Sequence, residues 1–275
     1  MDNNVNENKI PLANVLVAVT VLLVSVLGIW FFVFNDDNDV VESEDDLAMT
    51  QVEISDYIYD DNDVIESERD LAMAQMEIPH YIYIQGERFS TSENWLDLDN
   101  RGLQNEDILQ LRYMVNLTIL DLGDNEISDI TPLSGLTDLT FLFLTGNQIS
   151  DITPLSSLTD LTFLYLAENQ ISDITPLSGL TDLTFLYLSF NQINDITSLS
   201  GLTNLIDLDL RQNEISDITP LSGLTNLTDL ELSQNEISDI TPLSGLSSLI
   251  DLRLGNNEIS DWSPVAHVSD VTGRP

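Results

Sequence analysis

The sequence predicts an α/β solenoid, a coil with short parallel strands in a curved sheet on its concave face and short helical turns on its convex face. Two observations predict this fold class. From Leu117 the chain repeats every 22 residues, seven times, in the form L-x-x-L-x-L-x-x-N-x-I-x-D-I-x-P-L-x-x-L-x-x. Within each unit, leucines alternate with other residues over a few positions, which is the side-chain period of a β-strand. Because one unit cannot bury its apolar face alone, the repetition indicates units that stack on their neighbours.

An asparagine follows each predicted strand at the same place in the repeat. A buried amide carries donors and an acceptor, so it can satisfy backbone groups that lose their partners where the chain turns. The segment "TPLSGL" then returns the chain as a helical turn, for which we expect Thr131 as the cap and Pro132 at the first position. The predicted structural ladder consists of Asn125, Asn147, Asn169, Asn191, Asn213, Asn235 and Asn257.

The segments on either side of the repeats have different patterns. Residues 95–114 keep the leucine alternation but lose the asparagine register, and they contain a predicted short helix with Asn105 as its cap. Residues 261–275 place Trp262, Val265 and Val268 where the repeats have isoleucine and leucine. We expect both segments to cover the apolar ends of the coil. The predicted divisions are a cytoplasmic N-terminus (1–9), a transmembrane helix (10–34), an acidic linker (35–80), an N-terminal cap (81–116), the repeats (117–260) and a C-terminal cap (261–275).

Residues 10–34 carry no charge across 25 positions. As a helix this segment is roughly 37 Å long at ~1.5 Å per residue, which is enough to cross a hydrocarbon core of ~30 Å. Lys9 precedes it and the acidic stretch "NDDNDVVESEDD" follows it. The positive-inside rule therefore predicts a single-pass protein of the cell membrane, with the N-terminus in the cytoplasm and the repeats outside. The alternative is a cleaved signal peptide, whose apolar region is shorter, about 7–15 residues.

The acidic linker contains a tandem duplication. Residues 36–59 align without gaps to residues 60–83, with 18 of 24 positions identical. Both copies are too acidic to build a core, which favours a solvated spacer. Only the second copy, which ends at residues 81–83, leads into "IQGERFSTS", for which we predict a strand, a turn and a strand. The aspartate clusters suggest, at most, weak binding of divalent cations.

Composition excludes several classes of function. The chain has 47 acidic and 8 basic residues and a formal net charge of −39, so we predict no binding of nucleic acid, which needs clustered lysine and arginine. There is no cysteine, and only two histidines are present, far apart in the sequence. Asp207 and Asp229 could imitate the carboxylate pair of a glycosidase, but we expect flat stacked strands to give no enclosed pocket. We therefore predict no enzyme, no catalytic residue, no cofactor and no specific metal site.

The 22-residue pattern is the leucine-rich-repeat signature, at the short end of its range of periods. Residues 81–275 resemble the repeat domain of the internalin-like bacterial surface proteins, which have units of the form "NQISDITPLSGLTNL". The resemblance implies a repeat domain that binds proteins, often on host cells, through its concave sheet. It also implies that an unknown protein is the ligand.

The side chains at outward-facing strand positions do not pack in the core, so we expect them to determine which partner binds. The second to fourth repeats have aromatic residues there, and the fifth to seventh have acidic residues and two arginines. An exposed aromatic patch of this kind is typical of an interface centre. The candidate partner-binding residues are Phe141, Phe143, Phe163, Tyr165, Phe185, Tyr187, Phe190, Asp207, Asp209, Arg211, Asp229, Glu231, Asp251 and Arg253.

Three other interpretations remain open at this point. The aromatic residues could serve only to stabilise strand pairing, at ~0.2–1 kcal/mol per cross-strand pair. The chain could be an intracellular repeat scaffold or regulatory subunit. Finally, the aromatic columns could form the glycan-binding face of a surface adhesin.

Overall fold

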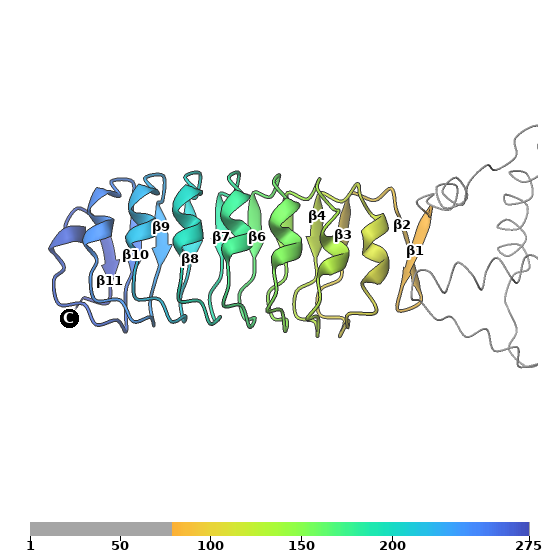
Figure 1. The fold of residues 1–275 in the computed structure, drawn as a ribbon, viewed down its shortest axis with the longest axis horizontal. Coiled ribbons are helices and arrows are strands. Elements are labelled where there is room, and N and C mark those ends of the chain that lie inside the picture. Colours follow the sequence, from red (N-terminus) through yellow and green to blue (C-terminus); the bar gives the residue numbers. More distant parts are fainter. Residues whose placement is uncertain (1–78, 275) are drawn as a thin grey trace, which may run out of the picture. The chain divides into compact units, whose positions relative to one another are not determined.

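The computed structural model describes residues 79–274. These residues form an antiparallel hairpin followed by a parallel sheet of nine strands, with a short 3-10 helix between most successive strands (Figure 1). The hairpin consists of β1 (Tyr81–Ile84) and β2 (Glu87–Ser90). The parallel strands are β3 (Trp95–Asp97), β4 (Ile119–Asp121), β5 (Phe141–Phe143), β6 (Phe163–Tyr165), β7 (Phe185–Tyr187), β8 (Asp207–Asp209), β9 (Asp229–Glu231), β10 (Asp251–Arg253) and β11 (Asp270–Thr272). The 3-10 helices are η1 (Leu109–Tyr113), η2 (Thr131–Leu133), η3 (Thr153–Ser157), η4 (Thr175–Gly179), η5 (Thr197–Gly201), η6 (Thr219–Gly223), η7 (Thr241–Gly245) and η8 (Ser263–Val265).

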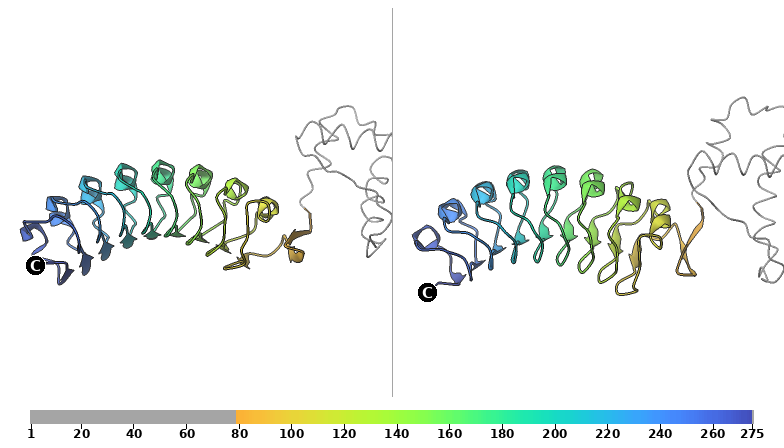
Figure 2. Two further views of the ribbon diagram at one scale, coloured as in Figure 1. Left: turned by 90° about the horizontal axis from the view of Figure 1, so that it is seen from below. Right: turned by 60° about the horizontal axis from the view of Figure 1, so that its bottom comes forward.

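The strands of the parallel sheet follow one another in chain order, and each pair is in register. The coil bends with the sheet on its inner side and the 3-10 helices on its outer side (Figure 2). The predicted parallel sheet and short helical turns are thus confirmed. The sheet is wider than the seven repeats alone predict, because β3 and β11, from the two predicted cap segments, also pair with it.

Leucine and isoleucine side chains fill the space between the sheet and the 3-10 helices. In one repeat Leu139, Leu142, Leu144 and Ile149 are all fully buried, and the same positions are buried in the other repeats. A fully buried side chain of this size stabilises a fold by roughly 1.5–3 kcal/mol relative to an exposed one. The buried residues form one continuous core from Ile82 to Val268. Every repeat therefore depends on its neighbours for stability.

Each asparagine of the ladder links two successive repeats. The Oδ1 atom of Asn147 accepts a hydrogen bond from the backbone N–H of Ile127, at 3.0 Å, in the preceding repeat. Its Nδ2 atom donates to the carbonyl oxygens of Leu122 and Leu144, at 2.9 and 3.2 Å. Equivalent bonds recur at Asn169, Asn191, Asn213, Asn235 and Asn257. Most of these amides are buried, where an unpaired polar group is costly, so their hydrogen bonds hold the strand-to-turn connections of adjacent repeats in register.

The caps of the 3-10 helices differ from the expectation. Thr131 does not cap η2, because it is the first residue of that helix and its own N–H needs an acceptor. Oδ1 of Asp129 accepts this N–H at 2.9 Å, and hydrogen bonds from the Thr131 hydroxyl and N–H lower the pKa of Asp129. The same backbone bond is made by Asp151, Asp173, Asp195, Asp217, Asp239 and Asp261.

The N-terminal end of the core is covered by the hairpin. The predicted strand, turn and strand are present as β1 and β2, and Ile82, Ile84 and Phe89 are buried against the core. Asn105 is not a helix cap, since η1 begins at Leu109 and the Oδ1 atom of Asn105 instead accepts N–H bonds from residues 128 and 129 in the first repeat.

The C-terminal end is closed by side chains that follow the last repeat. Val265 and Val268 are buried, and Trp262 packs against the core from a partly buried position. The Nε2 atom of His267 lies 3.1 Å from the carbonyl oxygen of Leu246, so this histidine belongs to the covering segment.

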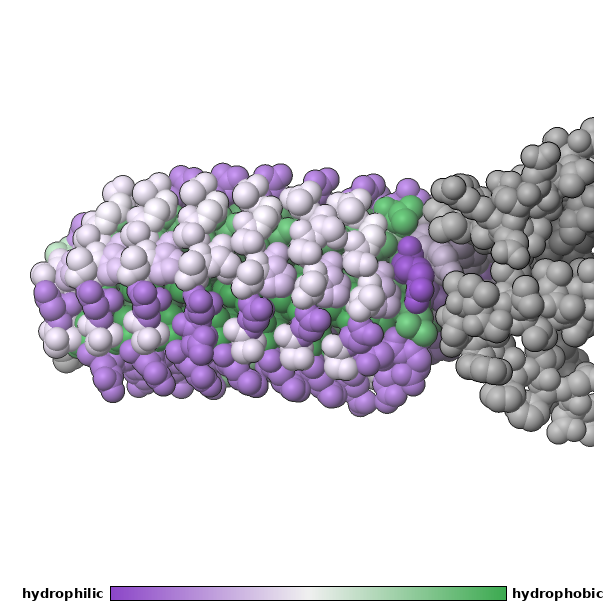
Figure 3. Space-filling model, in the orientation of Figure 1, coloured by the Kyte–Doolittle hydropathy of each residue, from purple (hydrophilic) through white to green (hydrophobic). Residues whose placement is uncertain are grey.

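The convex face presents the 3-10 helices. In Figure 3 this face is a pale band of residues with intermediate hydropathy, and hydrophilic residues gather along its margins. Between residues 79 and 274 no helix has the length and apolar character needed to cross a membrane. The predicted transmembrane helix at 10–34, the segment 1–9 and the linker up to residue 78 lie outside the described residues.

Candidate functional site

Two columns of side chains run along the concave face, one from the first residue of each strand and one from the third. The leucine between them points into the core, and the flanking side chains are half-buried in most of the strands. Strand register defines the members of each column. From β3 to β10, the first column is Trp95, Ile119, Phe141, Phe163, Phe185, Asp207, Asp229 and Asp251, and the second is Asp97, Asp121, Phe143, Tyr165, Tyr187, Asp209, Glu231 and Arg253; Asp270 and Thr272 of β11 end the two columns.

The aromatic residues of both columns stack face to face. In the first column the ring centroids of Phe141 and Phe163 are 4.3 Å apart, and those of Phe163 and Phe185 are 4.4 Å apart. In the second column Tyr165 stacks on Phe143 at 4.7 Å and on Tyr187 at 4.5 Å. Stacking covers the ring faces, so the columns present mainly ring edges to solvent. The result is an apolar surface over β5, β6 and β7 in which each ring is held by its neighbours.

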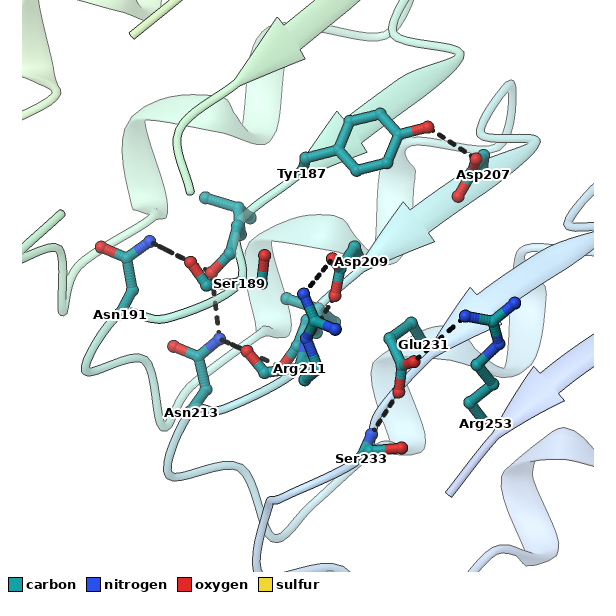
Figure 4. A network of polar contacts seen from close by, with 12 residues as sticks. Tyr187, Ser189, Asn191, Asp207, Asp209, Arg211, Asn213, Glu231, Ser233 and Arg253 are labelled. Atoms are coloured by element: carbon teal, nitrogen blue, oxygen red, sulfur yellow. Dashed lines mark hydrogen bonds and ion pairs between the residues drawn. The ribbon is translucent and has the colours of Figure 1, made fainter. Parts of the chain in front are cut away.

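Tyr187 and Asp207 join the aromatic half of the face to the acidic half. The Tyr187 hydroxyl donates a hydrogen bond of 2.6 Å to Oδ2 of Asp207 (Figure 4). Burial, with the Asp207 bond as the second cause, raises the pKa of Tyr187 far above its ordinary value. Burial also raises the pKa of Asp207; the Tyr187 bond opposes this, and the charges of Asp229 and Asp209 add to it. Tyr187 is therefore a neutral donor that holds one oxygen of a half-buried carboxylate.

The acidic half contains an open hollow of about 270 Å³. The hollow is open to solvent, so it is not the enclosed pocket that a glycosidase site would need. The curvature of the sheet and the short side chains of the first column together leave the space that aromatic rings fill farther along the coil. The lining residues are Tyr187, Asp207, Asp209, Arg211, Asp229, Leu230, Glu231, Asp251 and Arg253.

The two arginines of the hollow are engaged by carboxylates. Arg253 donates from Nε and Nη2 to the two oxygens of Asp251, at 3.2 and 2.8 Å, and lies 3.9 Å from Glu231. Hydrogen bonding and the charge of Asp251 raise the pKa of Arg253. Arg211 lies 3.9 Å from an oxygen of Asp209 (Figure 4). Among residues 79–274, no arginine or lysine forms an ion pair with Asp207 or Asp229.

The sequence of the repeats matches a family model described as "Leucine Rich repeats (2 copies)". The matched residues are 115–157, 159–201, 181–223, 203–245 and 225–267. The chain is also similar to a solved structure of an internalin C2 from Listeria monocytogenes, at 40% identity and a TM-score of 0.64. That alignment covers 68% of this chain and 85% of the other. The chain is an internalin-like leucine-rich-repeat protein.

Two further solved structures are similar to this internalin-like chain. An internalin inlF from Listeria monocytogenes matches at 34% identity and a TM-score of 0.57, over 68% of this chain and 62% of that one. The ectodomain of the Arabidopsis thaliana receptor kinase GASSHO1/SCHENGEN3, in complex with CASPARIAN STRIP INTEGRITY FACTOR 2, matches at 26% identity and a TM-score of 0.57. That match covers 64% of this chain and 23% of the receptor chain. This chain thus spans less than two thirds of the length of either protein. No match was found among curated proteins.

Leucine-rich-repeat proteins mediate protein–protein interactions, and the plant receptor above is described in complex with its factor. The internalin-like repeats described here therefore form a scaffold of a protein-binding type. The leucine framework leaves the first and third side chains of each strand outside the core.

Phe190 is held beside the columns in an unusual backbone conformation. Its φ angle is +57°, in the left-handed region that disfavours bulky side chains. The same position has positive φ in other repeats, where it is occupied by Asp124, Gly146, Glu168, Gln212, Gln234 and Asn256. The Arg211 guanidinium lies over the Phe190 ring at 5.0 Å from its centroid, and the residue is 36% exposed. The aromatic side chain of Phe190 thus occupies a backbone position that favours glycine and polar residues.

The sequence reasoning missed one aromatic residue of the first column. Trp95 is 56% exposed, and it pairs in register with Ile119, which in turn pairs with Phe141. The apolar part of the column therefore begins two strands earlier than predicted. The alternation in "WLDLDN" was the available signal, but the spacing from Trp95 to Ile119 is 24 residues and falls outside the repeat period.

Proposed function

We propose that this internalin-like chain is a membrane-anchored, surface-displayed protein that binds a protein partner through the concave face of its sheet. The observation that supports the proposal is the pair of stacked aromatic columns on β5, β6 and β7, with half-buried rings on an open face. The core does not need these rings, because the leucines between them are the residues that fill it. Aromatic residues are enriched at the centres of protein interfaces.

Stacking also prepares the surface for binding. Each ring is held by its neighbours, so little side-chain freedom remains to be lost when a partner arrives. The interpretation that the rings only stabilise strand pairing explains the stacks but not their open position. A contiguous aromatic surface in contact with water is costly for a monomer and typical of an interaction site.

The test replaces the middle of both stacks, Phe163→Ala with Tyr165→Ala. Partners captured by the full wild-type chain are identified, and the affinity of each is measured for the wild type and the variant. We expect a loss of at least about 30-fold, the size of a typical hot spot of ~2 kcal/mol. The double variant Leu109→Ala with Tyr113→Ala is the control, since it also removes two exposed apolar side chains, from η1.

The stability of the variant must be measured separately. The double replacement breaks all four aromatic stacks, at ~0.2–1 kcal/mol each, so a modest fall in the free energy of unfolding is expected. An affinity that stays at the wild-type level would show that the columns serve only the fold.

The stack geometry argues against the glycan-binding alternative. A sugar ring that packs on an aromatic side chain needs an open ring face, whereas in these columns the interior ring faces lie against neighbouring rings. Edges and hydroxyl groups remain for contact, which suits a protein surface better. A glycan array probed with the full chain distinguishes the two, because the protein-binding proposal expects no sugar whose binding depends on Phe163 and Tyr165.

Anchoring and surface display rest on residues 10–34 and on the charges around them. Protease added to intact cells that produce the full chain is expected to digest the repeats, and lysis should not be required. Repeats that are cut only after lysis would favour the intracellular scaffold or regulatory subunit instead.

A further inference from the structure

The hollow on the concave face lies directly beside the aromatic columns. Tyr187 belongs to both, since it ends the aromatic part of the second column and lines the hollow. A partner that extends past Tyr187 from the stacked rings therefore reaches the hollow. Whatever occupies the hollow must suit the charges of its lining.

The lining carries five carboxylates and two guanidinium groups. Both arginines are already paired with carboxylates, at Asp209 and at Asp251. Asp207 and Asp229 lie side by side on β8 and β9 as register partners. Carboxylates directly opposite one another in a sheet repel. The charge of Arg253 acts on Asp207 from a distance, but no arginine among residues 79–274 forms an ion pair with either aspartate.

The hydrogen bonds that the two aspartates accept reach only one oxygen of each. Oδ2 of Asp207 accepts from the Tyr187 hydroxyl, and Oδ2 of Asp229 accepts from the Thr228 hydroxyl, both at 2.6 Å. Within residues 79–274 their Oδ1 atoms have no hydrogen-bond donor from another side chain. Two neighbouring half-buried carboxylates that line the hollow, each with one oxygen that accepts no side-chain hydrogen bond among residues 79–274, form a slot of negative charge that a cationic group would complete.

We propose that the protein partner inserts a basic side chain, arginine or lysine, between Asp207 and Asp229, while an apolar segment next to it lies across the aromatic columns. The inference rests on the proposed function and adds to it the chemistry and the orientation of the partner. The apolar segment lies over β5 to β7 and the basic residue over β8 and β9, so the partner binds in one direction along the coil. Its charge is complementary to the hollow.

A second copy of the chain does not fit this role. The net charge of −39 makes two copies repel, and the protein has only eight basic residues to offer. The required partner is a basic and apolar segment from another protein.

The experiment uses the full chain as the probe on arrays of short synthetic peptides of varied sequence. We expect the bound peptides to combine arginine or lysine with neighbouring aromatic or leucine residues. Each bound peptide is then made again with citrulline in place of arginine, which keeps the shape and removes the charge. Its affinity is expected to fall by about tenfold, the lower end of the effect of losing a hydrogen bond to a charged group.

The reciprocal variant is Asp207→Asn with Asp229→Asn. Its affinity for the basic peptides should fall to a similar extent. It should also unfold at a higher denaturant concentration, because the repulsion is gone. The matched control is Asp160→Asn with Asp182→Asn, which removes the same charge from two exposed positions outside the strands. The control should bind the peptides as the wild type does.

The possible results separate this inference from the proposed function. Equal losses in both charge variants would mean that the acidic chain attracts basic peptides everywhere, which overturns the inference. Tight binding of calcium that is lost in Asp207→Asn with Asp229→Asn would also overturn it, since a metal would then be the occupant. Peptides whose binding needs Phe163 and Tyr165 but no basic residue would contradict the inference and would still support the proposed function. Bound peptides that are insensitive to both sites would contradict both.

Discussion

At the scale of single residues, Phe190 combines an unfavourable backbone conformation with an exposed aromatic side chain. Its positive φ angle favours glycine or asparagine, and Gly146 and Asn256 occupy the same position in other repeats. The left-handed conformation costs roughly 1–2 kcal/mol for a residue with a side chain. The contact with Arg211 recovers part of this cost, at about 0.5–1 kcal/mol for an exposed cation–π pair. Phe190 thus adds little to the fold.

We predict that Phe190→Gly leaves the free energy of unfolding unchanged or raises it by up to about 1 kcal/mol, since relief of the backbone offsets the lost contact. The same change should weaken partner binding. Denaturant unfolding and affinity measurements on the full chain check the two effects. Gln212→Gly is the control, because it relieves the same backbone position without removing an aromatic ring. A clear loss of stability in Phe190→Gly alone would mean that the ring is needed for packing.

At the scale of elements, each repeat is a short strand, an asparagine turn and a 3-10 helix. The helix is held by the preceding aspartate and, in most repeats, by a proline in its first positions. The exception is η5, where Ser198 replaces proline. The Ser198 hydroxyl is buried and has no hydrogen-bond partner among the described residues. A buried hydroxyl without a partner destabilises the fold.

Ser198→Pro is therefore expected to raise the free energy of unfolding by roughly 0.5–1 kcal/mol, because proline restricts the unfolded chain at a position where the other turns accept it. Removal of the unpaired hydroxyl acts in the same direction. Thermal and denaturant unfolding of the full chain measure the change. The reverse substitution Pro176→Ser in η4 should cost a similar amount. If Ser198→Pro destabilises the chain, the η5 backbone differs from that of its neighbours.

At the scale of the whole molecule, the carboxylates of residues 79–274 include two chemically different sets. The aspartates before the 3-10 helices accept hydrogen bonds, and these bonds lower their pKa values, as at Asp217 and Asp239. On the concave face, burial raises the pKa values of Asp121 and Asp207. The first set stabilises the fold in its ionised form, and the second is destabilising in its ionised form.

The stability of the full chain is expected to fall as the pH drops below 3.8, the ordinary pKa of aspartate. In this range the unfolded chain takes up protons that the folded turn aspartates resist, so protonation favours unfolding. Unfolding by denaturant at a series of pH values measures the effect. The variant Asp217→Asn with Asp239→Asn keeps acceptors for the N–H groups and should show a shallower fall. If the free energy of unfolding of that variant falls as steeply with pH, other groups cause the acid sensitivity.

Asp207→Asn should behave in the opposite way. Because the pKa of Asp207 is raised in the folded state, its ionised form weakens the fold at neutral pH. Replacement by asparagine is expected to stabilise the chain at neutral pH and to lose this advantage once the pH is low enough to protonate Asp207 in the wild type.

Much of the fold could be predicted because it repeats. The leucine alternation places Leu142 inside and Phe141 and Phe143 outside whatever the neighbours are, and the fixed period stacks those positions on their equivalents. The segments without the exact period were harder. Trp95 joins the first column at a spacing of 24 residues, and Asn105 bonds to the first repeat instead of capping a helix.

The sequence by itself determined the solenoid, its inward leucines and the division of the concave face into an aromatic and an acidic half. These follow because every repeat carries the same apolar positions and must bury them on one face. The tertiary structure decided how those side chains meet: the stacked rings, the Tyr187–Asp207 bond, the hollow, and the two aspartates without an arginine partner among the described residues. Such contacts depend on strand register and sheet curvature between repeats, which no single repeat encodes.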